Sequence, residues 1–140
     1  MQDDVLSRWG AAVLRITLGV MYLTHGLVLK VFMHGIAGTT AFFESIGMPS
    51  YSALAVIAAE TIGGVLLILN VQTRLVTLAL LPVLAGATWV HAGNGWVFSH
   101  EGGGWEYPVF LIAASIAVAL QAPSRAVLPA RRQAQVSGAA

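Results

Sequence analysis

The sequence predicts an all-α membrane protein, a bundle of four transmembrane helices, and composition and hydropathy carry that prediction. Hydrophobic residues make up 57% of the 140 residues and charged residues only 9%, whereas soluble domains carry about 25% charged residues. Mean hydropathy is +0.79, and the apolar residues form long runs between short polar breaks. The chain has no cysteine, which excludes internal disulfides, thiolate metal sites and cysteine-held iron–sulfur clusters.

The first predicted span, residues 11–29, has close to the ~20 apolar residues that cross the hydrocarbon core. Lys30 follows it and is interpreted as an interfacial anchor. In the next loop, Thr39 or Thr40 is expected to cap a short helix over residues 41–46. Because this helix contains two phenylalanines, it is predicted to lie at the membrane surface, as an interfacial helix in the first outer loop.

The other three predicted spans are residues 52–69, 75–90 and 107–122. Pro82 lies inside the third of them, where neighbouring helices in a bundle can accommodate a kink. The fourth span has the shortest apolar run and needs its aromatic start or Gln121 to complete a crossing. The four-helix membrane domain is therefore expected to cover residues 11–122.

The basic residues predict the orientation. With four spans, the N-terminal segment 1–10, the 70–74 connector and the tail 123–140 share one side of the membrane. The other side has Lys30 alone. The tail is small, polar and basic, which predicts disorder. The positive-inside rule then puts both termini in the cytoplasm. The basic residues on the cytoplasmic side are Arg8, Arg74, Arg125, Arg131 and Arg132.

Glu60 is the first candidate for function, because a charge at such a depth costs roughly 2.5–3.5 kcal/mol on insertion scales. It lies roughly 12 Å from the outer end of its span, and on the first span Tyr22 and His25 lie roughly 10 Å and 6 Å from the same face. These depths favour Tyr22 and His25 as its neighbours. A bridge to Arg15 stays open, as does snorkelling of Arg15 to the inner headgroups. A purely structural role for Glu60, joining helices or staying protonated, is equally open.

The first and third spans contain loosely similar patterns of glycine, an aromatic residue and histidine: Gly19-x-x-Tyr22-x-x-His25-Gly26 and Gly86-x-x-Trp89-x-His91-x-Gly93. Both segments bring an aromatic residue and a histidine to the outer half of the bundle. Two such histidines could hydrogen-bond a quinone carbonyl or, less favoured, ligate haem or copper. No motif specifies a cofactor, so no metal ligand and no catalytic residue is assigned. The predicted polar pocket consists of Glu60, His25, His91, Tyr22 and Arg15.

The outer loop before the fourth span is rich in glycine and tryptophan. Tryptophans at this depth are typical of an interfacial aromatic belt. Five glycines among polar residues instead suggest a loop shaped as a lid over the pocket. The candidate residues of this loop are Asn94, Trp96, Trp105 and Glu106.

These motifs, taken together, resemble the DoxX family of small bacterial membrane proteins. The resemblance covers roughly residues 11–122, and one difference is Asn70, which stands where the family often has glycine. The matching residues are Leu14-Arg15, Gly19, His25-Gly26, Lys30, Gly47-Met48-Pro49, Glu60-x-x-Gly63-Gly64, Thr73-Arg74, His91-Ala92-Gly93-Asn94-Gly95-Trp96 and Gly103-Gly104-Trp105-Glu106-Tyr107-Pro108.

The resemblance implies a four-helix bundle in the bacterial inner membrane and a role beside redox enzymes. The expected function is that of an accessory or quinone-interacting subunit of a membrane oxidoreductase system, with a protein partner, a lipid bilayer environment and no nucleic acid. Glu60 would accept or relay a proton and the histidines would orient the ligand. Two alternatives are a proton-coupled carrier of a small solute and a membrane anchor for a soluble enzyme.

Overall fold

The computed structural model describes residues 2–122, so the predicted tail lies outside the described residues. Within this range every regular element is helical, which confirms the all-α prediction. A long first helix, α1, continues directly into the π-helical segment η1. The elements are α1 (Gln2–Leu23), η1 (Thr24–Met33), α2 (Gly35–Ser45), α3 (Ser50–Ile68), α4 (Thr73–His91), the 3₁₀ turn η2 (Ala92–Asn94) and α5 (Glu106–Gln121).

Helix length and hydropathy identify a multi-pass membrane protein. Among the described residues, three helical stretches are long and apolar enough to cross a bilayer: Gln2–Met33, Ser50–Ile68 and Thr73–Asn94. The shorter apolar helix Glu106–Gln121 corresponds to the predicted fourth span. Large apolar side chains such as Trp9, Phe110 and Leu120 are exposed on the outside of the bundle. This exposure is expected for side chains that contact lipid, whereas it would be unfavourable in water.

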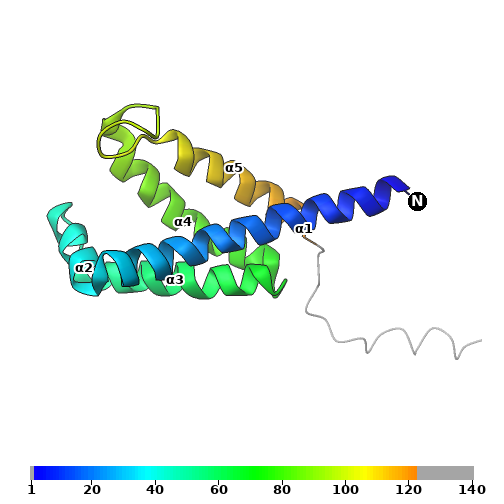
Figure 1. Cartoon of the computed structure of the whole chain (residues 1–140), viewed down its shortest axis with the longest axis horizontal. Helices are drawn as coiled ribbons and strands as arrows, with labels where there is room; N and C mark the ends of the chain where they lie inside the picture. The colour runs from blue at the N-terminus through cyan, green and yellow to red at the C-terminus, as the bar shows by residue number, and fades with distance from the viewer. Residues whose placement is uncertain (1, 123–140) are drawn as a thin grey trace, which may run out of the picture.

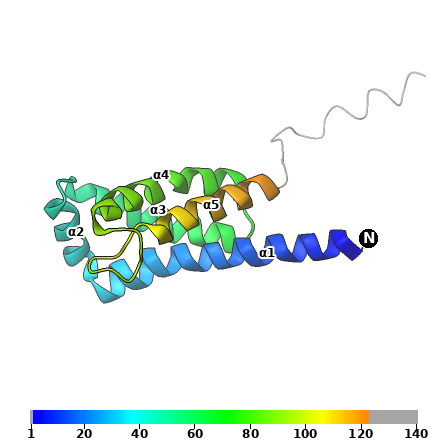
Figure 2. The same ribbon diagram turned by 90° about the horizontal axis from the view of Figure 1, so that it is seen from above.

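The helices form two pairs, α1 with α3 and α4 with α5 (Figure 1). The N-terminus and the α3–α4 connector lie at one end of the bundle. Helix α2 and the loop before α5 lie at the other end, as the second view also shows (Figure 2). The α3–α4 connector and the loop before α5 therefore lie at opposite ends of the bundle.

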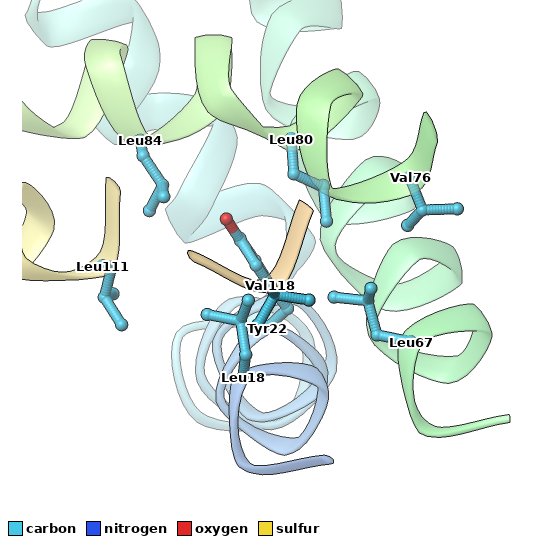
Figure 3. Packing of buried hydrophobic residues seen from close by; sticks show 8 residues of the cluster. All are labelled: Leu18, Tyr22, Leu67, Val76, Leu80, Leu84, Leu111 and Val118. Carbon is cyan, nitrogen blue, oxygen red and sulfur yellow. The ribbon is translucent and has the colours of Figure 1, made fainter. Parts of the chain in front are cut away.

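The core lies between the two pairs, and all four long helices contribute to it (Figure 3). Tyr22 of α1 is 1% exposed and points into the middle of the cluster. Its hydroxyl group and Ser115 Oγ on α5 are 3.3 Å apart. This contact joins the first pair to the second inside an apolar setting. The cluster consists of Leu18, Tyr22, Leu67, Val76, Leu80, Leu84, Leu111 and Val118.

Glycines let α1 and α3 approach each other closely. A Cβ on Gly19 would lie 2.8 Å from the carbonyl oxygen of Gly64, and one on Gly64 would lie 2.7 Å from the carbonyl oxygen of Gly19. Small residues of this kind are typical of helix contacts in membranes. On the other side of α3, a Cβ on Gly63 would lie 2.7 Å from Leu80 of α4. Gly63 and Gly64 therefore allow close helix approach on both sides of α3.

The first helix and the loop helix both begin earlier than predicted. Helix α1 starts at Gln2, because Asp3 and Asp4 in the first turn favour a helix N-terminus. Helix α2 starts at Gly35, whose φ of 72° allows a sharp turn out of η1.

The predicted cap at Thr39 or Thr40 is wrong, because both threonines lie inside α2. Their hydroxyl groups donate to carbonyl oxygens, Thr39 to Lys30 at 2.7 Å and Thr40 to Ile36 at 2.8 Å. The location of α2 at the membrane surface stays a prediction.

The connector between α3 and α4 is a tight turn. Asn70 has a φ of 58° and Gln72 a φ of 46°, both in the left-handed region. Asparagine tolerates this conformation better than most residues, and glycine adopts it freely. Asn70 therefore adopts a backbone conformation in this chain that glycine adopts freely. The Thr73 hydroxyl donates to Asn70 Oδ1 at 2.9 Å and secures the turn.

Candidate functional site

The most distinctive polar feature is an ion pair between Glu60 of α3 and Lys30 of η1. Lys30 Nζ lies 2.5 Å from Glu60 Oε2, and the side chains are 21% and 7% exposed. Ionisable residues within membrane segments are rare and mark functional pathways by default. Removing one partner of a buried pair strongly destabilises the protein, because the other charge is left without compensation.

The π-helical segment brings Lys30 to α3. Its hydrogen bonds run from residue i to residue i+5, and the bond from His34 N to Leu29 O, 2.9 Å long, continues this pattern at its end. A Cβ on Gly26 would lie 2.8 Å from both Glu60 Cβ and Thr61 Oγ1. The backbone of η1 therefore rests directly on α3 beside the ion pair. Irregular turns of this type occur frequently at functional sites.

A third element fixes the position of Lys30. Helix α2 packs against both η1 and α3. Its buried Thr39 donates a hydrogen bond to the carbonyl oxygen of Lys30, a group that the π-helical turn leaves accessible. The ion pair is therefore positioned by contacts among η1, α2 and α3.

One buried polar group at this site has no partner. Among the described residues, Thr61 Oγ1 is the buried side-chain atom without a hydrogen-bond partner. It lies in the turn after Glu60, against Gly26. Buried polar atoms are hydrogen-bonded in the large majority of cases, so an orphaned hydroxyl needs an explanation.

The predicted neighbours of Glu60 have other contacts. Tyr22 reaches Ser115, and His25 Nδ1 lies 2.9 Å from the carbonyl oxygen of Met21. Because a carbonyl only accepts, this contact places the proton of a neutral His25 on Nδ1 and leaves Nε2 as an acceptor. The His25 ring also stacks on Tyr107, with centroids 6.2 Å apart. The structure thus gives Glu60 a partner, Lys30, that differs from both expected ones.

The structure places Arg15 at the C-terminal end of α3 and not beside the ion pair. Its Nη1 donates to the carbonyl oxygens of Leu67 and Ile68, the latter at 2.9 Å. The last carbonyls of a helix lack intrahelical donors and attract a nearby cation. Arg15 therefore neither bridges to Glu60 nor extends only to the headgroups. It closes the end of α3 that lies far from the ion pair.

His91 is engaged by the outer loop. Its Nδ1 lies 3.0 Å and 3.1 Å from the carbonyl oxygens of Gly102 and Gly103. Asn94 Nδ2 donates to the same two carbonyls, at 2.9 Å and 3.0 Å. In the described part of the chain no contact joins His91 to His25 or to Glu60. The expected meeting of the two histidines in one pocket is therefore not found.

The other predicted loop residues hold the loop together. Trp96 and Trp105 pack edge to face with centroids 4.4 Å apart. Glu106 accepts a hydrogen bond from the backbone N–H of Phe98 at 2.9 Å. The loop is thus closed on itself in the manner of a compact Ω-loop. Its role as a lid stays a prediction.

Lys30 is the site residue that the sequence-based reasoning missed. A lysine at the end of a span normally anchors it to the interface, and that interpretation concealed its partnership. The available signal was its place on the same outer half of the bundle as Glu60, with opposite charge. Within residues 2–122, no group of three or more histidine, aspartate or glutamate residues is arranged to hold a metal ion.

Comparison with known proteins gives a consistent result. A curated protein of Bacillus subtilis (strain 168) described as "Putative oxidoreductase CatD" is 40% identical over 78 residues, which is 56% of this chain and 56% of the relative. The chain thus matches about half the length of that relative. No solved structure matches it significantly. The DoxX family profile matches residues 10–93, a range that includes both members of the ion pair, and so the chain belongs to the DoxX family.

Proposed function

We propose that this protein is a quinone-interacting accessory subunit of a membrane oxidoreductase, in which Lys30 and Glu60 handle protons. The ion pair carries the proposal, since intramembrane ionisable pairs commonly serve as proton relays. The name of the Bacillus subtilis relative supports a redox setting. The electrons would come from a partner protein, because a chain without cysteine has no thiolate-held cluster of its own.

The residues fit the head of a quinone. The Lys30 ammonium on η1 is a donor for a carbonyl oxygen, and the orphaned Thr61 hydroxyl on α3, one residue after Glu60, is a second donor. A bound quinone would supply the redox chemistry, taking up electrons and protons at its carbonyl oxygens. A proton that Lys30 gives up would have to be replaced from outside the pair. Glu60, the carboxylate beside Lys30, would accept that incoming proton and pass it to Lys30, which restores the neutral pair. His25, with Nε2 as acceptor, would bind a hydroxyl group of the reduced quinol and not a carbonyl oxygen of the quinone.

Replacing Glu60 by glutamine tests this proposal. The protein is purified in mild detergent, its lipids are extracted, and bound quinone is measured by mass spectrometry together with an oxidised-minus-reduced optical spectrum. We expect near-stoichiometric quinone in the unmodified protein. Glu60→Gln should reduce retention about tenfold, because the amide no longer holds Lys30 as a charged donor.

Glu44→Gln is the matched control, because it makes the same change on an exposed position of α2 and should leave quinone retention unchanged. Absence of quinone from the unmodified protein would contradict the proposal. Equal retention in both variants would also contradict it. Uptake of a small solute into proteoliposomes that follows the pH gradient and is lost in Glu60→Gln would instead support the carrier alternative.

The proposal places the protein in the bacterial inner membrane with both termini in the cytoplasm. Arg8 lies near the start of α1 and Arg74 in the first turn of α4, after the connector at the same end of the bundle, while Lys30, near the end of η1, is neutralised by Glu60. The positive-inside rule favours the arginine end as cytoplasmic.

Cysteine labelling tests this orientation directly, because the native chain has no cysteine. Ser99→Cys, exposed in the outer loop, should react with a membrane-impermeant maleimide in intact cells. Gln2→Cys, exposed at the start of α1, should react only after the cells are lysed. The reverse pattern would overturn the proposed orientation.

A further inference from the structure

A second polar site lies at the opposite end of the bundle from the ion pair. A pocket of about 270 Å³ opens there between the first turns of α1, the α3–α4 connector and the last turn of α5. This volume is just below the range of about 300–1,000 Å³ typical of pockets for drug-sized ligands, so it suits a small group. Its polar lining residues are Arg8, Arg15, Asn70, Thr73 and Gln121.

The polar groups of this pocket are mainly hydrogen-bond donors. Arg15 uses Nη1 for the carbonyls of α3, which leaves Nε and Nη2 for another acceptor. Asn70 Oδ1 accepts from Thr73, so the Asn70 amide group faces other partners as a donor. Arg8 adds a second guanidinium group two helical turns before Arg15. None of the described lining residues carries a carboxylate.

The floor of the pocket is small and apolar, which gives it room for a compact ligand. Ala11 and Ala12 on α1 and Val118 on α5 line it together with the polar residues. The lining includes two arginines, and the planar fork of a guanidinium group suits a phosphate or carboxylate. Thr73, at the N-terminus of α4, also lines the pocket, and this helix end has no side-chain cap and carries partial positive charge.

From this arrangement we infer that the pocket binds a net-negative phosphate group, with Arg8, Arg15 and Asn70 as its donors. The phosphate belongs either to the headgroup of an anionic phospholipid or to a soluble anion. This site is separate from the proposed quinone site and does not depend on it. Its occupant would link α1 to the α3–α4 connector, because Arg8 and Arg15 lie on α1 and Asn70 lies in the connector.

Stabilisation by defined probes tests the inference. The protein is placed in nanodiscs of phosphatidylcholine, of phosphatidylcholine with phosphatidylglycerol, or of phosphatidylcholine with added inorganic phosphate, and thermal unfolding is followed. A ligand that binds only the folded protein raises the midpoint of unfolding. A rise with phosphatidylglycerol alone identifies a lipid headgroup, and a rise with inorganic phosphate identifies a soluble anion. No rise with either probe overturns the inference.

Three variants connect the effect to the pocket. Arg8→Gln removes one donor, and Asn70→Asp places a carboxylate among the donors while still accepting the hydrogen bond from Thr73 and tolerating the left-handed turn. Each should weaken the apparent affinity about tenfold. Arg74→Gln removes the same charge from the same end without lining the pocket and should change the affinity less than about twofold. Equal losses in all three variants would indicate general surface charge and overturn the site.

Discussion

Lys30→Met is expected to destabilise the bundle by about 3–5 kcal/mol, because it leaves the Glu60 carboxylate buried without its partner. Methionine keeps most of the length and apolar volume of the lysine stem, so the loss reflects the charge and not a cavity. Thermal unfolding in detergent, followed by the fluorescence of the four tryptophans, measures the effect. Glu44→Gln on the exposed face of α2 gives the baseline for a single charge change.

The double variant Lys30→Met with Glu60→Gln separates a true pair from two independent residues. Replacing both members of a buried ion pair by neutral groups is often nearly neutral for stability, whereas removing one is costly. We therefore expect the double variant to be more stable than Lys30→Met alone. Additive losses in the two single variants would show that the residues do not interact in the folded protein.

Much of the fold could be predicted because each membrane span is recognisable from its own run of apolar residues. The run before and after Glu60 is apolar over nearly the whole of α3, and the observed helix Ser50–Ile68 differs from the predicted span 52–69 by at most two residues. Such a pattern depends only on the bilayer as solvent. Helix ends in the loops were less predictable. The start of α2 depends on the backbone turn at Gly35, which threonine capping preferences do not report.

The central residue of the candidate site could be predicted from the sequence, but its contacts could not. A carboxylate inside an apolar helix stands out in any sequence, and Glu60 is indeed 6% exposed as a residue. Its partner depends on how η1 turns, and a π-helical segment changes the direction of every side chain after Thr24 relative to an α-helix. The contacts of Arg15 could not be predicted for a related reason. Depth along the membrane normal cannot show that the carbonyls of Leu67 and Ile68 are closer acceptors.

These observations indicate that the ion pair depends on glycine at position 26. The backbone of η1 meets α3 at this residue, and any side chain larger than hydrogen would separate the two segments. The nearest atoms to a Cβ there include the backbone nitrogen of Thr61, at 2.9 Å, which cannot move as a side chain does. Gly26 lies four residues before Lys30 in η1, so we expect this contact to affect how Lys30 reaches Glu60.

Gly26→Ala is therefore expected to destabilise the protein by about 3 kcal/mol, near the upper end for overpacking a close contact. Gly86→Ala is the matched control, because a Cβ added at this position in α4 has no neighbouring atom within 4 Å. That control should be neutral or stabilising by about 0.5–1 kcal/mol, as expected for glycine replaced in a helix. Thermal unfolding of both variants gives the comparison.

The Gly26→Ala variant also reports on the ion pair itself. If it moves η1 away from α3, Lys30 and Glu60 separate, and adding Lys30→Met to it should cost less than Lys30→Met costs in the native background. A loss of unchanged size would mean that the pair survives the displacement. In that case the contact at Gly26 and the ion pair would be independent, and the position of Lys30 would depend on α2 through Thr39 alone.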